Sequence, residues 1–301
     1  MEIDYDVIVA GSGPAGLTAS LYLAREGYRV LNVTGEEPGG NLANISLIEN
    51  YPGVEACSGM DLWKVMMKQC KDAGVEFLEF ENVSHYEVCG SNDIFAPVEV
   101  YLESDEKIVA NSFISCIGGK HRTLGLSNEA EFFGNGISFC ATCDGPLYKD
   151  KNVIIIGGGN SAIDFALTLS KYCNEVEIIH RRNQFRASSD MIEKLAIRKN
   201  IKINFNSEVE EICKNDIRDT FDITIKNNVT KNEEVLSGVH GIFYALGFER
   251  NFIPCRVGGM NNGTFSAGDC HTDTERQVIT AAGDGCHAAM KCIEFLKRNG
   301  I

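Results

Sequence analysis

Two copies of one pattern constrain the fold of this chain more than any other feature. In each copy a short apolar run is followed at once by a glycine-rich turn, and a helical sequence begins directly after the turn. The first copy has a predicted strand at 5–10, a turn at 11–16 and a helix at 17–25, and the second has a strand at 152–156 before the turn 157–162. This order is typical of a dinucleotide-binding unit. We therefore predict an α/β fold with two Rossmann-like, three-layer ββα nucleotide-binding domains.

The glycines of the first turn have different physical roles. Gly11 permits the tight turn, Gly13 lets backbone N–H groups approach a pyrophosphate, and Gly16 allows the helix to pack closely on the strand. Pro14 and Ala15 stand between the last two glycines and belong to the same turn. Since a strand, a helix and a second strand surround the turn, we predict that it binds a cofactor.

A segment rich in turn-forming residues follows the second strand of this unit. Its acidic residues lie about 25 residues after the first glycine, where a carboxylate reaches a ribose hydroxyl in such units. Both a plain surface loop and a loop that faces a flavin fit this composition. The residues predicted to contribute to a cofactor site here are Gly35, Glu36, Glu37, Gly40, Asn41, Leu42 and Asn50.

In the second unit, basic residues stand where the first unit has acidic ones. Its candidate binding residues are Gly157, Gly159, Asn160, Ser161 and Ala162, and the strand after its helix runs into His180, Arg181 and Arg182, with Arg186 close behind. A carboxylate at this place would favour a free ribose hydroxyl, whereas guanidinium groups favour a 2′-phosphate. The alternative interpretation is a solvated basic edge. In so acidic a chain the arginines favour NADPH over NADH.

Cys140 and Cys143 form the one closely spaced pair among the twelve cysteines. Two thiols at this spacing can close a small disulfide ring, and such pairs often form thiolates readily, which suits dithiol exchange. Zinc binding is the competing interpretation, but it needs a second ligand pair at similar spacing, and the other cysteines form none. Asp144 supplies a proton donor or acceptor beside the sulfurs. We predict a redox-active pair and no metal site.

The last part of the chain carries a further group of candidates. A short strand-like run, 262–267, leads to Gly268 and Asp269, and a helix is predicted over 280–296. Asp269 could bond a ribityl hydroxyl or cap that helix. Arg276, Gln277 and Val278 precede the helix and complete the predicted site.

The composition excludes several classes of function. A formal net charge of -14 opposes any general attraction to nucleic acid or to anionic lipid. The acidic start of the chain is unlike a secretory or mitochondrial leader, and no apolar run reaches the roughly 18 residues of a membrane span. Scattered cysteines are typical of reduced thiols. We therefore expect a cytoplasmic protein that binds neither nucleic acid nor membrane.

The order of the elements predicts one unit split by another. Residues 1–113 lack a last strand and helix until the chain returns at 244–301, and residues 114–243 carry the thiol pair and the second glycine turn. Within the first part, 61–74 is predicted to be a helix in which Trp63 is a core or helix-face residue. A strand-rich antiparallel region is predicted from the segments 76–80, 83–89, 97–103 and 107–116. Length agrees with two domains, since 301 residues exceed what one core usually organises.

Taken together, these motifs resemble those of the low-molecular-weight thioredoxin reductases over nearly the whole chain. The features that carry the resemblance are Gly11 to Gly16, Gly35 to Leu42, Glu49 to Gly53, Cys140 to Gly145, Gly157 to Ala162, His180 to Arg182 with Arg186 and Ala187, Gly268 with Asp269, and Arg276 with Gln277. The resemblance implies a homodimer with FAD in the split domain and NADPH in the inserted one. It implies that Cys140 attacks a protein substrate, Cys143 faces the flavin and Asp144 handles the proton.

The function expected from this resemblance is the reduction of the disulfide of thioredoxin or a thioredoxin-like protein with electrons from NADPH. A ferredoxin-linked reductase and an oxygen-dependent oxidase of small dithiols are alternatives on the same fold. A flavin-binding redox sensor without turnover is an alternative of another class.

Two stretches depart from the family pattern. Only 20 residues separate Gly247 from Gly268, where the family usually has a longer excursion with additional strands. Cys116-Ile117-Gly118 stands where the family has Ala-Thr-Gly before the chain crosses to the inserted domain. We expect the first departure to alter the local shape of the FAD domain and the second to alter a hinge.

Overall fold

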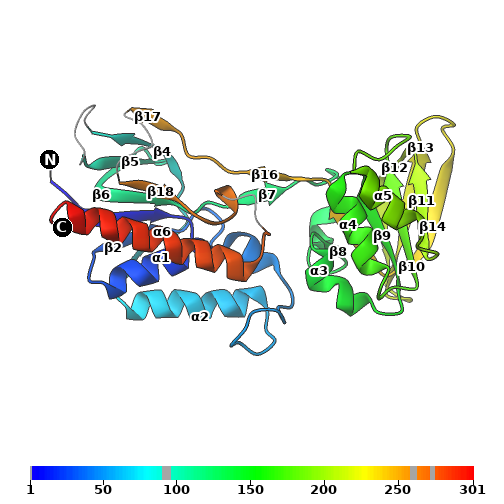
Figure 1. Ribbon diagram of the computed structural model, residues 1–301, viewed down its shortest axis with the longest axis horizontal. Helices are drawn as coiled ribbons and strands as arrows, with labels where there is room; N and C mark the ends of the chain where they lie inside the picture. The colour runs from blue at the N-terminus through cyan, green and yellow to red at the C-terminus, as the bar shows by residue number, and fades with distance from the viewer. Residues whose placement is uncertain (1, 90–95, 258–262, 272–274) are drawn as a thin grey trace. The chain divides into compact units, whose positions relative to one another are not determined.

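The computed structural model describes residues 2–89, 96–257, 263–271 and 275–301. The chain divides into two compact units (Figure 1). The first unit consists of residues 1–120 and 250–301, and the second consists of residues 121–249. The chain therefore leaves the first unit, forms the second and returns, as an inserted domain requires.

The first unit is built on a sheet whose described strands have the order β17-β4-β5-β6-β1-β2-β3, with β18 beside β6. The strands are β1 (Tyr5–Ala10), β2 (Val30–Val33), β3 (Glu76–Leu78), β4 (Val83–Val88), β5 (Val98–Leu102), β6 (Lys107–Ser115), β17 (Cys255–Val257) and β18 (Thr264–Ser266). β1 pairs in parallel with β2 and β6, while β5 is antiparallel to β4 and β6.

The sequence interpretation was wrong about β3. It lies in 76–80, the first of the four segments predicted to be antiparallel, yet it pairs in parallel with β2. The reason is the helix between the two strands, since a helical crossover returns the chain in its original direction. Among the described strands of this sheet, β4, β5 and β6 form the antiparallel part.

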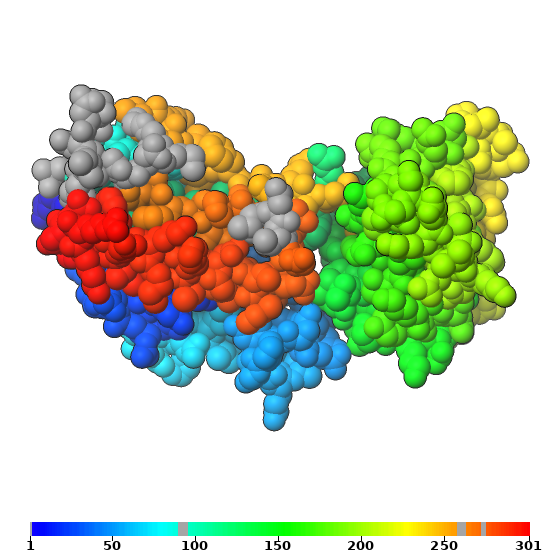
Figure 2. Space-filling view, in the orientation of Figure 1, coloured from blue at the N-terminus to red at the C-terminus, as the bar shows by residue number. Residues whose placement is uncertain are grey.

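Three helices lie on one side of the parallel strands of this unit (Figure 1). They are α1 (Pro14–Arg25), α2 (Gly59–Asp72) and α6 (Val278–Arg298), and α6 is the orange to red helix in Figures 1 and 2. Val7 and Val9 of β1 pack among residues of these helices, and Ile8 belongs to the core on the other side. β1 is thus buried on both faces, which explains its unbroken apolar sequence.

The second unit contains a parallel sheet of order β11-β10-β9-β15-β8 and an antiparallel sheet of order β12-β13-β14. Its strands are β8 (Ile137–Ser138), β9 (Asn152–Gly157), β10 (Glu175–His180), β11 (Ile201–Phe205), β12 (Ser207–Asn215), β13 (Thr220–Asn227), β14 (Glu233–Val239) and β15 (Gly241–Ala245). Its helices are α3 (Ala141–Asp144), α4 (Asn160–Leu169) and α5 (Ser189–Ala196).

The parallel strands of the second unit are covered on both faces. Ile155 and Ile178 pack with Ile163 of α4, whereas Ile154 and Ile223 belong to a core shared with the antiparallel sheet. Both units therefore have the layered α/β architecture that the glycine turns predict.

Four turns of 3-10 helix complete the described chain, η1 (Gly40–Asn44), η2 (Glu129–Phe132), η3 (Gly145–Tyr148) and η4 (Gly268–Cys270). The two connections between the units form a small sheet of β7 (Gly119–His121) and β16 (Phe248–Arg250). In the short segment after Gly247, β17 pairs in parallel with β4. Residues 258–262, which include the start of the predicted run at Asn262, lie outside the described residues.

Candidate active site

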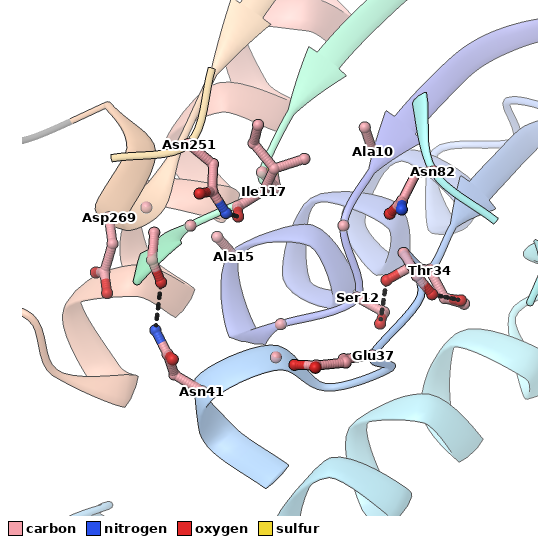
Figure 3. A pocket seen from close by; sticks show the side chains of 18 of the residues that line it. Ala10, Ser12, Ala15, Thr34, Glu37, Asn41, Asn82, Ile117, Asn251 and Asp269 are labelled. Carbon is pink, nitrogen blue, oxygen red and sulfur yellow. Dashed lines mark hydrogen bonds between the residues drawn. The ribbon is translucent and has the colours of Figure 1, made fainter. Parts of the chain in front are cut away.

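A cavity of about 620 Å³ lies in the first unit, beside the glycine turn that follows β1 (Figure 3). Its lining includes twelve residues that the sequence predicts for a cofactor site: Gly11, Gly13, Pro14, Ala15, Gly35, Glu36, Glu37, Gly40, Asn41, Leu42, Gly268 and Asp269. These residues come from three separate stretches of chain, 11–15, 35–42 and 268–269. The loop 35–42, for which sequence left two interpretations open, therefore faces a cavity.

The three glycines of the first turn differ in the space around them. Gly11 has φ of +102°, and a Cβ on it would lie 2.4 Å from the Cys116 carbonyl oxygen. A Cβ on Gly16 would lie 1.9 Å from the Gly11 carbonyl oxygen. Gly13 lines the cavity, and the nearest atom to a Cβ there is the Gly39 oxygen at 3.8 Å. The fold thus requires Gly11 and Gly16, whereas the space at Gly13 is open to a ligand.

Ser12 and Trp63 shape this turn, and the sequence interpretation assigned neither to the site. The Ser12 hydroxyl donates to the Thr34 carbonyl oxygen (2.9 Å) and accepts from the Gly39 N–H (3.0 Å). The Trp63 indole N–H donates to the Ser12 carbonyl oxygen (3.0 Å). These bonds hold the glycine turn against the loop that contains Gly39. Sequence gives no signal for them because the partners are far apart in the chain.

The opposite wall of the cavity comes from residues 116–120 and 250–253, which sequence did not predict as site residues. Asn41 Nδ2 donates to the Gly119 carbonyl oxygen (2.9 Å), and Asn251 Nδ2 donates to that of Ile117 (2.9 Å) (Figure 3). Asn82 Oδ1 accepts from the Glu36 N–H (3.1 Å). Asparagine amides therefore join the separate stretches that enclose the cavity.

Asp269 lines the same cavity from η4. Burial raises the pKa of its carboxyl, and the nearby Arg276 guanidinium opposes that rise. Of the two roles that sequence left open for Asp269, helix capping is not observed, because the residue that caps α6 is Gln277, in a capping box with Thr280. The Asp269 side chain thus lines the cavity and does not cap α6.

Five predicted residues lie outside the cavity lining: Gly16, Asn50, Arg276, Gln277 and Val278. Gly16 packs beneath the turn, as described above. Asn50 Nδ2 donates to Gln277 Oε1 (3.3 Å), so these two residues join the loop before α2 to the start of α6.

The second glycine turn repeats the division of roles seen in the first. A Cβ on Gly157 would lie 2.5 Å from the Ala245 carbonyl oxygen, and one on Gly158 would lie 2.3 Å from the His180 ring. Gly159, the N-cap of α4, has no atom within 4 Å of its Cβ position. The open position again precedes the first turn of a helix, where backbone N–H groups suit a phosphate.

His180 differs from the arginines that follow it. Its side chain is buried, and its Nε2 lies 3.1 Å from the Gln184 carbonyl oxygen. Burial lowers the pKa of His180, and Arg186, Arg182 and Arg181 lower it further. His180 therefore packs beneath the glycine turn, whereas the side chains of Arg181, Arg182 and Arg186 are exposed.

The remaining candidates of this turn lie at the start of α4. Asn160 Oδ1 accepts from the Ser188 N–H (3.0 Å), which ties the helix to the segment after the arginines. Ser161 is exposed and Ala162 is buried. The Arg186 N–H donates to the Gly158 carbonyl oxygen (2.8 Å), so turn and basic segment are directly joined.

Cys140 and Cys143 form a disulfide with a Cα–Cα distance of 5.4 Å. Cys140 caps α3, and its Sγ accepts from the Cys143 N–H (3.1 Å). Both residues are partly exposed. An N–H directed at a sulfur stabilises negative charge on it, which favours the thiolate once the disulfide opens.

Asp144 lies beside the pair and is joined to it through Ser138. The Ser138 hydroxyl donates to Asp144 Oδ2 (2.6 Å) and accepts from the Cys140 N–H (3.0 Å). Burial raises the pKa of Asp144, while the bond from Ser138 opposes that rise. The carboxyl therefore keeps its proton to a higher pH than an ordinary aspartate, which suits a proton donor.

Within residues 2–89, 96–257, 263–271 and 275–301, no helix is long and apolar enough to cross a membrane. No group of three or more His, Cys, Asp or Glu side chains in the same ranges could hold a metal ion.

Comparison with known proteins identifies relatives over the full length of the chain. The pyridine nucleotide-disulphide oxidoreductase family matches residues 5–296. The thioredoxin reductase of Rickettsia typhi is 34% identical over 99% of this chain and 100% of its own, and that of Mycoplasma genitalium is 32% identical over 96% and 95%. The solved structure of thioredoxin reductase from Streptococcus pyogenes has a TM-score of 0.86 and 30% identity, with 98% of each chain covered.

Proposed function

Since this chain belongs to the thioredoxin reductases of the pyridine nucleotide-disulphide oxidoreductase family, we propose that it reduces the disulfide of thioredoxin or a thioredoxin-like protein with electrons from NADPH. The observation that carries the proposal is the Cys140–Cys143 disulfide, with the Asp144 carboxyl joined to it through Ser138. A dithiol with a proton donor beside it can exchange with a protein disulfide.

Family membership implies a flavin and a nicotinamide cofactor. We assign FAD to the first unit, because its cavity contains the open position at Gly13, the start of α1 and the side chain of Asp269. The pyrophosphate would meet backbone N–H groups of the glycine turn, and Asp269 would bond a hydroxyl of the ribityl chain.

NADPH is assigned to the second unit. Gly159 leaves room for a pyrophosphate at the start of α4, and Arg181, Arg182 and Arg186 would hold the 2′-phosphate. When bound, the two cofactors supply hydride transfer and a pair of electrons for the disulfide. The first unit, predicted as residues 1–113 and 244–301, would then be the FAD domain, and the second, predicted as residues 114–243, the NADPH domain.

The residues of the thiol segment divide the exchange between them. Cys140, as a thiolate stabilised by the Cys143 N–H, attacks a sulfur of the substrate disulfide, which forms a mixed disulfide and releases the other substrate sulfur. Asp144 gives that leaving thiolate a proton. Cys143 then attacks Cys140, which releases the reduced substrate and restores the disulfide. Two electrons and two protons leave with the substrate in each cycle.

The assembly and its compartment are part of the same proposal. We propose a homodimer, supported by exposed apolar side chains on the adjoining helices α1 and α6, among them Tyr22, Ile279 and Met290. We propose the cytoplasm, supported by the ten other cysteines, all of which lie in the described ranges as free thiols.

Two measurements on the FAD-loaded protein test the function. Under anaerobic conditions NADPH should bleach the flavin rapidly and NADH should do so far more slowly, whereas a ferredoxin-linked enzyme or a dithiol oxidase would not be bleached by NADPH. Addition of thioredoxin should then give many turnovers of a disulfide dye, which a sensor without turnover would not.

The matched control for these measurements is Cys140→Ser with Cys143→Ser. This double variant should still bleach with NADPH, because the glycine turns and arginines are unchanged, but it should reduce no thioredoxin. Undiminished reduction of thioredoxin by the double variant would disprove the role of the pair.

A further inference from the structure

An aromatic ring stands at each end of the second unit, where its chain begins and where it ends. His121 belongs to β7 and Phe248 to β16, and the two rings meet edge to face with centroids 5.0 Å apart. The Arg122 N–H donates to the Gly247 carbonyl oxygen (3.0 Å), so the backbone is also hydrogen-bonded at the residues next to His121 and Phe248. The His121 ring is therefore held in place from one side.

The other side of the His121 ring lies flat on Phe139. The centroids are 4.5 Å apart and the ring planes differ by 19°. Phe139 also meets Phe133 (5.3 Å) and Tyr244 (5.7 Å). The Tyr244 hydroxyl donates to Glu129 Oε2 (2.9 Å), a carboxylate that also accepts two backbone N–H groups, so Phe139 rests on a fixed ring.

Phe139 is the residue directly before Cys140. On its other side, Ser138 is held in the sheet by pairing with Phe243 of β15. After Cys140, Ala141 is buried at the start of α3. Cys140 is the N-cap of α3, and its carbonyl oxygen accepts from the Asp144 N–H (3.1 Å). Phe139 is thus the link between the sheet and this cap, and its ring packing fixes the backbone that leads into Cys140.

This anchor matters most when the disulfide is open. While Cys140 is bonded to Cys143, the covalent link fixes its sulfur. In the dithiol that link is gone, and the Cys140 sulfur stays near the Cys143 N–H only if the backbone at residues 139 and 140 keeps its conformation.

We propose that His121 is a positioning residue for the exchange reaction. By stacking on Phe139 it keeps the Cys140 thiolate over the Cys143 N–H and pointed at its substrate. This inference deepens the proposed function and rests on it, since it concerns the cysteine that attacks the substrate disulfide.

The variants that test it are His121→Ala, which removes the stack, and His121→Phe, which keeps a ring of similar size. His85→Ala is the matched control, because His85 stacks on Tyr101 in the first unit with centroids 4.4 Å apart and planes 4° apart. It removes a comparable stack from a place that neither cofactor site nor thiol pair includes.

Stopped-flow kinetics separate the steps. An aromatic stack contributes about 0.5–1.5 kcal/mol, and about 1.4 kcal/mol corresponds to a factor of ten in rate. We therefore expect His121→Ala to slow reoxidation of the enzyme by thioredoxin about two- to tenfold. Flavin reduction by NADPH should be unchanged, His121→Phe should stay within about twofold of the parent, and His85→Ala should match it. Normal exchange in His121→Ala, equal slowing in His121→Phe or His85→Ala, or an equal loss in the flavin step would each overturn the proposal.

A second readout needs neither cofactor nor thioredoxin. In a Cys143→Ser background, alkylation of Cys140 by iodoacetamide proceeds through the thiolate, and mass spectrometry follows it. His121→Ala should slow it about two- to tenfold and His121→Phe should restore it. If the parent protein fails to reduce thioredoxin, the proposed function is wrong, yet the alkylation rates still decide whether His121 positions Cys140. Equal rates in all variants would refute that role.

Discussion

Replacing Gly13 by alanine tests the cofactor site of the first unit with little disturbance of the fold. A Cβ at Gly13 would have the Gly39 oxygen as its nearest neighbour, at 3.8 Å, an ordinary van der Waals contact. Gly13 is the N-cap of α1, and alanine at this position lowers the stability of the folded protein by about 0.5–1 kcal/mol relative to glycine. Alanine also reduces the conformational entropy of the unfolded chain, which raises the free energy of unfolding by about 0.4–1 kcal/mol. We expect the free energy of unfolding of the cofactor-free protein to change by less than about 1 kcal/mol.

The same methyl group should weaken FAD binding strongly. It would occupy the space through which a pyrophosphate reaches the backbone N–H groups of the turn. A hydrogen bond to a charged group contributes about 1.5–3 kcal/mol, so the loss of one raises the dissociation constant for FAD about 10- to 150-fold. The perturbation thus separates binding from folding.

Gly16→Ala is the matched control. Its Cβ would lie 1.9 Å from the Gly11 carbonyl oxygen, so the backbone must move and the cofactor-free protein should lose stability. Denaturant unfolding of the cofactor-free proteins gives the stabilities, and titration of flavin fluorescence gives the affinities. If Gly13→Ala bound FAD as tightly as the parent protein, or lost as much stability as Gly16→Ala, the assignment of roles to the two glycines would be refuted.

Three further predictions concern the second unit. Because burial raises the pKa of Asp144, thioredoxin reduction should be fastest below that pKa and should fall as the pH rises through it. Asp144→Asn should lower the rate about 100-fold or more and abolish this pH dependence. A pH–rate profile of the variant that kept the dependence would count against the proton-donor role. Arg181→Ala combined with Arg182→Ala should raise KM for NADPH about tenfold or more and leave KM for NADH nearly unchanged in initial-rate assays, whereas equal changes would point to a plain basic edge. Gly158→Ala should cost about 1–3 kcal/mol of stability in thermal unfolding because its Cβ would meet the His180 ring at 2.3 Å, while Gly159→Ala should cost less than about 0.5 kcal/mol and weaken NADPH binding; equal destabilisation would contradict this division.

Much of the site could be predicted from the sequence because its parts are local. The glycine turns, the arginines after β10 and the cysteine pair with Asp144 each lie within a few residues of one another, so the chemistry follows from residue type and spacing. The loop 35–42 was ambiguous by itself, since composition does not distinguish a loop on a cavity from a loop in solvent. The structure resolves that ambiguity because residues of this loop line the cavity, and Asn41 donates a hydrogen bond to the Gly119 carbonyl oxygen of another part of its lining.

The sequence by itself determined which segments fold into strands, turns and helices around two glycine-rich turns, because steric rules at glycine and the period of apolar residues act over short distances. Only the tertiary structure decided that β3 joins β2 in parallel, that residues 116–120 and 250–253 enclose one cavity, and that His121 lies on Phe139. Each of these facts is a contact between residues that are far apart in the sequence. Such contacts depend on how whole elements pack, and no local pattern in the sequence predicts them.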